Sequence, residues 1–98
     1  TQSALRRVEK MEDAYEKAIS ELENVVNPKI ADLKIELALN YRERLETIDE
    51  QIRRCKEELN RNPANTHIRR YLLVALQDKK QTLMEIHNLN PSNINILE

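Results

Sequence analysis

Two histidines and one cysteine are the residues of this sequence that could bind a transition metal. His67 and His87 stand far apart in the chain, and neither is followed by a His or Cys at the third or fourth position. A zinc site needs three or four ligands converging on the ion. Cys55 and His67 could approach each other across a helical turn, but no further ligand accompanies them, and a thiol on an apolar stripe is ordinarily inert. We therefore expect no metal and no cofactor.

Closely spaced carboxylates are the second candidate for chemistry. A general acid/base pair needs carboxylates in a cleft, with pKa values pushed apart by burial. The cluster lies among arginines at the spacings of surface ion pairs on a helix, and the sequence holds no Gly-rich phosphate loop and no nucleophile motif. We therefore expect a surface rather than an active site, and no enzyme. The carboxylates concerned are Glu43, Glu46, Asp49 and Glu50.

Basic residues gather on both sides of the Asn62-Pro63 pair. They could form the solvated end of a helical bundle, or a patch that receives an acidic partner or a phosphate. Tyr71 is the one aromatic residue among them, so the base stacking of single-strand nucleic-acid binders is missing. The net charge of −1 gives no general attraction to nucleic acid or membranes. The residues of this candidate patch are Arg53, Arg54, Arg61, His67, Arg69 and Arg70.

The composition indicates that these residues are carried on long helices. The 98 residues include no glycine, and 34% are charged. Hairpin turns and phosphate-binding loops depend on glycine, whereas a Gly-free sequence rich in Leu, Glu, Lys, Arg and Ala is typical of helix. No apolar run is long enough to span a membrane, and no signal peptide opens the sequence. Because the first residue is Thr1, we expect a piece of a longer chain.

Asn-Pro pairs divide the sequence into segments, because Asn is a good N-cap and Pro suits the first helical position. The residue before a proline is also pushed away from helical geometry. Asn65-Thr66 is a competing start for the last helix. The pairs, Asn27-Pro28, Asn62-Pro63 and Asn90-Pro91, predict one domain over residues 1–88 with helices at about 2–26, 28–61 and 64–87, and a flexible tail over 89–98.

Apolar residues recur at steps of three and four in each segment, which predicts an amphipathic stripe on each helix. In the third stripe Lys79 takes a position where an apolar residue is expected. Short connections make successive helices antiparallel. We therefore predict an all-α fold, an antiparallel three-helix bundle or helical coiled coil with a long central second helix. A tetratricopeptide-like repeat is the alternative, but the second helix is too long for it and glycine is missing.

Two stretches, 14–26 and 40–83, resemble the C-terminal region of zinc-finger, anti-sigma-factor-like bacterial membrane proteins. That family has a Tyr-x-x-Ala-Ile-x-x-Leu-Glu helix, an Ile-Asp-x-x-Ile helix, an Asn-Pro-x-Asn turn and a Tyr-Leu-Leu-x-Ala helix. The corresponding residues here are Tyr15, Ala18, Ile19, Leu22, Glu23, Ile48, Asp49, Ile52, Asn62, Pro63, Asn65, Tyr71, Leu72, Leu73, Ala75, Lys80 and Leu83. The family's zinc finger and membrane helix are absent from this sequence.

The resemblance implies a non-catalytic sensory or interaction domain on the extracytoplasmic side of a membrane-anchored regulator of transcription. Contact with the membrane would come only through a segment that this sequence lacks. The expected partner is a protein or a second copy in a homodimer, with no small-molecule substrate and no nucleic acid. Two alternatives are a cytoplasmic coiled-coil adaptor or oligomerisation module, and an anion- or nucleic-acid-binding hairpin that uses the basic patch.

Overall fold

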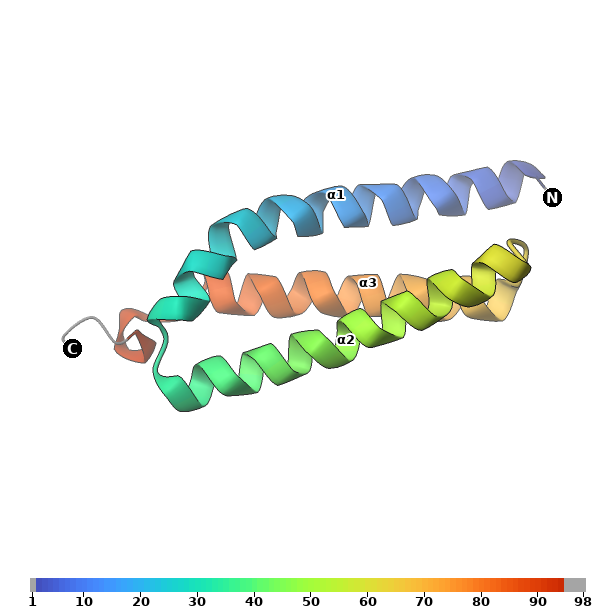
Figure 1. Cartoon of the computed structure of the whole chain (residues 1–98). Coiled ribbons are helices and arrows are strands. Elements are labelled where there is room, and N and C mark those ends of the chain that lie inside the picture. The colour runs from blue at the N-terminus through green and yellow to red at the C-terminus, as the bar shows by residue number, and fades with distance from the viewer. Residues whose placement is uncertain (1, 95–98) are drawn as a thin grey trace.

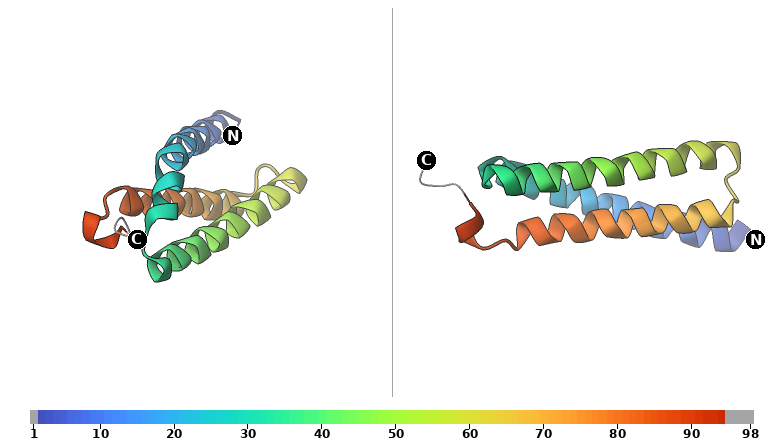
Figure 2. Two further views of the ribbon diagram at one scale, coloured as in Figure 1. Left: turned by 60° about the vertical axis from the view of Figure 1, so that its left-hand side comes forward. Right: turned by 90° about the horizontal axis from the view of Figure 1, so that it is seen from below.

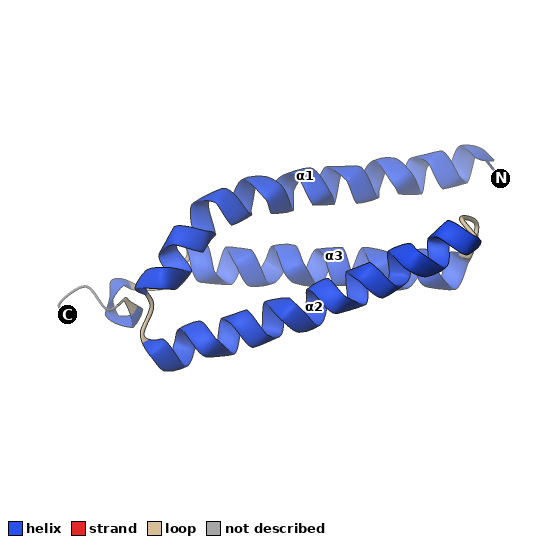
Figure 3. Cartoon of the chain, viewed as in Figure 1, coloured by secondary structure: helices blue, strands red, loops and turns tan. Residues whose placement is uncertain are grey.

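The computed structural model describes residues 2–94 and confirms an all-α fold (Figures 1 and 3). Within this range there is no strand, only an isolated bridge between Leu33 and Ile94. The helices are α1 (Gln2–Asp32), α2 (Ile35–Arg61), α3 (Thr66–His87) and a 3₁₀ turn, η1 (Pro91–Asn93).

The three long helices run along one axis and form an elongated bundle of 55 × 19 × 15 Å. Figure 2 shows that the turn between α2 and α3 lies at the end of the bundle where the chain begins. The helix α3 packs along both α1 and α2, whereas α1 and α2 scarcely touch. The predicted bundle is therefore confirmed, but its central element is α3 and not the second helix.

The side chains of α3 explain its central position. Its buried residues face both neighbours and include Leu83 and Ile86, which are 1% and 0% exposed. Between them and the start of the helix lie buried Leu72, Ala75 and Leu76. The inner side of α2 carries fewer fully buried residues, and an ion pair between Lys56 and Glu16 joins α2 to α1. The helix with the most complete apolar surface therefore lies in the middle, where both of its sides are covered.

The first predicted boundary, at Asn27-Pro28, is wrong. Pro28 lies inside α1, which continues to Asp32 and bends toward its C-terminal end (Figure 1). A proline inside a helix removes one backbone hydrogen bond and bends the helix. Val26 and Ile30 are buried on either side of this proline, and their burial holds the last turns of α1 against the core. Consequently α2 begins at Ile35 and is shorter than the predicted 28–61 segment.

Residues 89–94 of the predicted flexible tail pack against the bundle, whereas the rest of that tail lies outside the described residues. Leu89 and Ile94 pack against the core. The amide of Lys34, in the turn between α1 and α2, donates to the carbonyl oxygen of Asn93 at 3.1 Å. In addition, the Lys29 ammonium donates to the carbonyl oxygen of His87 at 2.8 Å. The segment thus closes one end of the bundle.

The second turn follows the alternative boundary at Asn65. The helix α2 ends at Arg61, as predicted, and α3 begins at Thr66 and not at residue 64. The Asn65 side-chain oxygen accepts a hydrogen bond from the Ile68 amide at 3.1 Å. This contact satisfies one of the unpaired amides at the start of the helix. The competing cap therefore decides where α3 begins, and Pro63 stays in the turn.

Replacing Asn65 with alanine is expected to lower the free energy of unfolding by about 1 kcal/mol, because the N-cap hydrogen bond is lost. Urea unfolding followed by circular dichroism measures this difference. Asn60→Ala is the matched control, since Asn60 is exposed within α2 and alanine favours helix there. Equal stabilities of Asn65→Ala and the unmodified chain would contradict the capping role.

Candidate interaction surface

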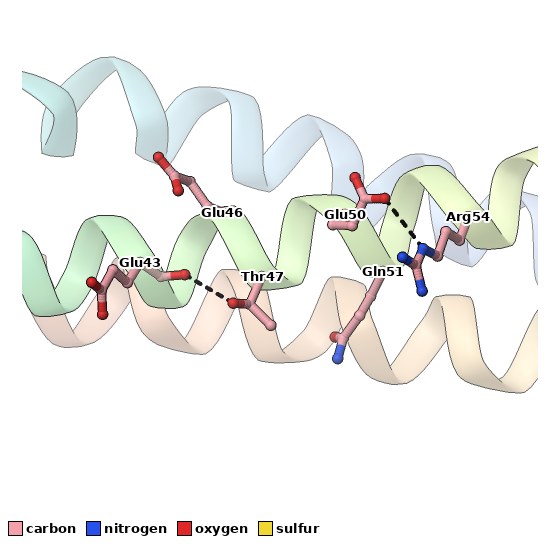
Figure 4. A pocket seen from close by; sticks show the side chains of 6 residues that line it. All are labelled: Glu43, Glu46, Thr47, Glu50, Gln51 and Arg54. Carbon is pink, nitrogen blue, oxygen red and sulfur yellow. Dashed lines mark hydrogen bonds and ion pairs between the residues drawn. The ribbon is translucent and has the colours of Figure 1, made fainter.

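Three of the four carboxylates of the predicted cluster lie along α2 in Figure 4, whereas the fourth, Asp49, pairs with Lys79 of α3. Glu43, Glu46 and Glu50 line a shallow hollow there, all of whose lining residues belong to α2. Glu50 accepts hydrogen bonds from Arg53 and from Arg54. The hydrogen bonds from Arg53 lower the Glu50 pKa to about 2. A carboxylate held ionised at the surface suits an ion pair and cannot act as a general acid near neutral pH.

Most of the predicted basic patch is engaged in ion pairs. Arg53 binds Glu50 and Glu57, Arg54 binds Glu50, and Arg61 binds Glu58, all within α2. Arg69 turns inward to Glu12 of α1. His67 and Arg70 are exposed on α3, and within residues 2–94 neither takes part in a salt bridge. The six residues therefore do not form one uncompensated basic surface.

Lys79 joins the three helices at the middle of the bundle. Its ammonium lies 2.6 Å from Asp49 of α2 and 3.1 Å from Glu23 of α1, and its side chain is only 12% exposed. Burial lowers the Lys79 pKa, but the hydrogen bonds with Asp49 and Glu23 outweigh it, so that the pKa is raised. The charged residue in the apolar stripe of α3 is thus a cation shared by two carboxylates.

A second buried ion pair joins α1 to α3 nearer the start of the chain. Arg69 Nη1 donates to Glu12 Oε1 at 2.6 Å, and Glu12 is 6% exposed. The other carboxylate oxygen, Glu12 Oε2, is buried without a hydrogen-bond partner. Burial raises the Glu12 pKa, and the nearby Arg69 charge only partly offsets this effect. Glu12 was not among the predicted site residues, although it takes the heptad position of the apolar Leu5, Ile19 and Val26.

Within the described part of the chain, no group of three or more His, Cys, Asp or Glu residues could hold a metal ion. Cys55 is half-buried beside the core, and burial raises the pKa of its thiol. A raised pKa keeps the sulfur protonated and therefore unreactive at neutral pH.

The apolar stripe of α1 divides into two rows, and only one of them is buried. The inner row consists of Ile19 and Val26, with Glu12 one heptad earlier. The second row is shifted around the helix by one residue and contains Met11, Ala18 and Val25; we call it the outer row. Met11 is 48% exposed and Val25 is 55% exposed, although both are large apolar residues.

Contacts with α2 and α3 show on which side of α1 the outer row lies. Glu16 pairs with Lys56 and so marks the side of α1 that faces α2. The Tyr15 hydroxyl accepts a hydrogen bond from Gln77 and marks the side that faces α3. Residues three and four apart are neighbours on a helix, so Met11 and Ala18 adjoin Tyr15. The outer row therefore flanks α3, on the side of α1 away from α2.

Two hollows lie along this side, between α1 and α3. The first, at the end where the chain begins, is lined on its apolar floor by Leu5 and Val8 of α1 and Leu73 of α3. The second lies farther along and is lined by Tyr15 and Met84, among others. The outer row lines neither hollow but lies beside them, and we call the hollows and the row together the outer groove. Its residues are Leu5, Val8, Met11, Tyr15, Ala18 and Val25 of α1, and Leu73 and Met84 of α3.

Comparisons with protein families, with curated proteins and with solved structures gave no match. Among the described residues, no helix is long and apolar enough to cross a membrane.

Proposed function

We propose that this chain is a non-catalytic protein-interaction domain that binds a partner helix along the outer groove. The observation that carries the proposal is the exposed outer row. Met11, Ala18 and Val25 recur once per heptad, and Tyr15 and Leu22, which are half-buried against the core, complete alternating steps of four and three. This spacing is typical of a helix that packs against another helix.

The exposure of large apolar side chains to water also supports the proposal, because burying them against a partner is favourable. The outer row is exposed beside α3, and the first hollow opens between α1 and α3 at the end of the bundle, where Leu5 continues the inner row. Aligned apolar residues of this kind on a soluble protein commonly mark an interaction site. A groove with apolar residues at heptad spacing suits the apolar side of an amphipathic helix. The exposed or paired state of the α2 carboxylates supports the non-catalytic part of the proposal.

Nuclear magnetic resonance mapping tests this function on the whole chain. The probe is an amphipathic peptide of about three heptads, with leucine at the core positions and glutamine at the flanks. We expect it to shift the amide signals of Met11, Ala18 and Val25 and to leave those of Ile35 and Leu39 on α2 unchanged. Ile35 and Leu39 are also exposed apolar residues, at 70% and 51%. Shifts at α2 alone, or none in a monomeric chain, would overturn the proposal.

A pair of variants adds a matched control. Met11→Glu with Val25→Glu is expected to abolish the shifts, because charges in the outer row cannot be buried without a partner. Ile35→Glu with Leu39→Glu makes the same chemical change on α2 and is expected to preserve them. Light scattering over a concentration series shows whether a second copy occupies the groove. Self-association that only the outer-row variant abolishes would also support the proposed function.

The regulatory context is a separate proposal, which rests on the helix-and-turn resemblance alone. It holds that the domain belongs to an anti-sigma-factor-like regulator and lies outside the cytoplasm. A membrane helix and a zinc-finger segment upstream in the full-length product would support it. An upstream region without either would favour the cytoplasmic adaptor.

A further inference from the structure

We propose that the outer groove takes an acidic amphipathic helix of another protein, and not a second copy of this chain. This inference rests on the proposed function and adds the chemistry of the partner. It follows from the charges around the groove, which differ from those of the chain as a whole.

Cations and no carboxylates line the two hollows of the groove. Arg69 and Arg70 border the first hollow, and Lys80 borders the second, where it lies over the Tyr15 ring at 5.5 Å. Neither hollow has an Asp or Glu in its lining, although the chain has 17 acidic and 16 basic residues. The Glu12 carboxylate compensates Arg69, so Arg70 and Lys80 are the charges available to a partner.

On α1, two acidic residues lie on the side toward α2, and a basic residue lies beside the outer row. Glu9 and Asp13 lie toward α2, where they border a hollow that Lys56 of α2 also lines. Arg7 lies three residues from Ala4 and four from Met11, so it adjoins the outer row. Within residues 2–94, Arg7 and Arg70 take part in no salt bridge. The end of the groove near the chain start therefore has positive charge on both helices.

A partner with carboxylates beside its apolar residues complements this arrangement. Its apolar side chains would cover the floor of the groove, and its carboxylates would lie near Arg7 and Arg70. The groove extends from Leu5 to Val25, which corresponds to roughly 30 Å of helix at about 1.5 Å per residue. A helix of about three heptads spans that length.

A second copy of the chain complements the groove less well. By the same rule its own outer row adjoins Arg7 and Glu21, so it would bring one cation and one carboxylate against the cations of the groove. Like charges placed across an interface oppose binding. The charge pattern therefore favours a different, acidic protein over self-association.

Calorimetric titration of the whole chain with two probe peptides tests the inference. Both carry leucine at the same heptad core positions, but one has glutamate at every flanking position and the other has lysine. We expect the glutamate peptide to bind at least about tenfold more tightly, because only its charges complement the groove. Its affinity is expected to fall as salt is raised, since salt screens exposed charges.

Charge reversal on the protein tests whether the cations at the outer groove attract the glutamate peptide. Arg70→Glu is expected to weaken the glutamate peptide about tenfold and to strengthen the lysine peptide. Arg42→Glu changes the net charge equally on exposed α2, away from the groove, and is expected to leave both affinities unchanged. Circular dichroism confirms folding, and Arg70→Gln serves as the second variant if Arg70→Glu does not fold.

The outcomes separate this inference from the proposed function. Equal binding of both peptides at the outer row, or dimerisation through it, would overturn the acidic partner while leaving a helix-binding groove. Binding of neither peptide by a monomeric chain would overturn both. Equal effects of Arg70→Glu and Arg42→Glu would also overturn the inference, because the attraction would then come from net charge.

Discussion

Replacing Arg69 with methionine is expected to lower the free energy of unfolding by about 3–5 kcal/mol at neutral pH, because it leaves the Glu12 carboxylate buried without its partner. In the native protein Arg69 satisfies one carboxylate oxygen, while Oε2 already has no hydrogen-bond partner. Without Arg69, neither oxygen would retain a charged partner. Urea unfolding followed by circular dichroism measures the loss. Arg61→Met is the control, because the Arg61–Glu58 pair is exposed and contributes little.

The loss caused by Arg69→Met is expected to depend on pH. Burial raises the Glu12 pKa above its ordinary value of 4.5, and Arg69 opposes this rise. A carboxyl group with a raised pKa in the folded state binds more protons there than in the unfolded chain. Its contribution to stability is therefore complete below pH 4.5 and disappears as the pH rises through the raised pKa. Removing Arg69 raises this pKa further, so the variant should lose more stability at pH 7 than at pH 4.

Two other carboxylates near Glu12 also raise its pKa, as burial does. Glu9 and Glu16 raise its pKa through repulsion, and Lys56 of α2 pairs with Glu16.

A double replacement, Glu12→Leu with Arg69→Met, removes the titrating group as well as the cation. We expect it to recover most of the stability at pH 7, because well-packed apolar residues often replace a buried ion pair without loss. The same loss for Arg69→Met at both pH values would contradict this account.

Replacing Leu83 with alanine is expected to cost about 2–5 kcal/mol, because it opens a cavity where α3 packs on its neighbours. Leu83 is 1% exposed and belongs to the central cluster of the core. The central position of α3 predicts that the loss affects the whole bundle, so helicity should disappear in one transition at lower urea concentration. Leu39→Ala is the matched control. Leu39 is 51% exposed on α2, and its replacement is expected to change stability by less than about 1 kcal/mol.

A loss of similar size for Leu83→Ala and Leu39→Ala would contradict this account, because the exposed Leu39 would then stabilise the bundle as much as the buried Leu83.

Local sequence signals predicted the helices themselves and one of the two turns between them. These signals are the absence of glycine, the apolar periodicity and the N-cap at Asn65. Each depends only on residues close together in the chain, so it can be recognised in the sequence without knowledge of the fold. Asn27-Pro28 has the same local signal as Asn62-Pro63, yet α1 passes through it. The difference is tertiary: Val26 and Ile30 are buried against the other helices, and their burial outweighs the backbone bond lost at Pro28.

The candidate interaction surface depended even more on tertiary structure. The sequence alone established that α1 carries an apolar stripe and that Lys79 interrupts the stripe of α3. Only the packing of the bundle decided that Ile19 is buried while Val25 stays exposed, and that Glu23 and Asp49 meet at Lys79. The apolar periodicity indicates which residues lie on the same side of one helix. Which part of that side is covered depends on where the neighbouring helices lie, and that is settled by contacts between residues far apart in the chain.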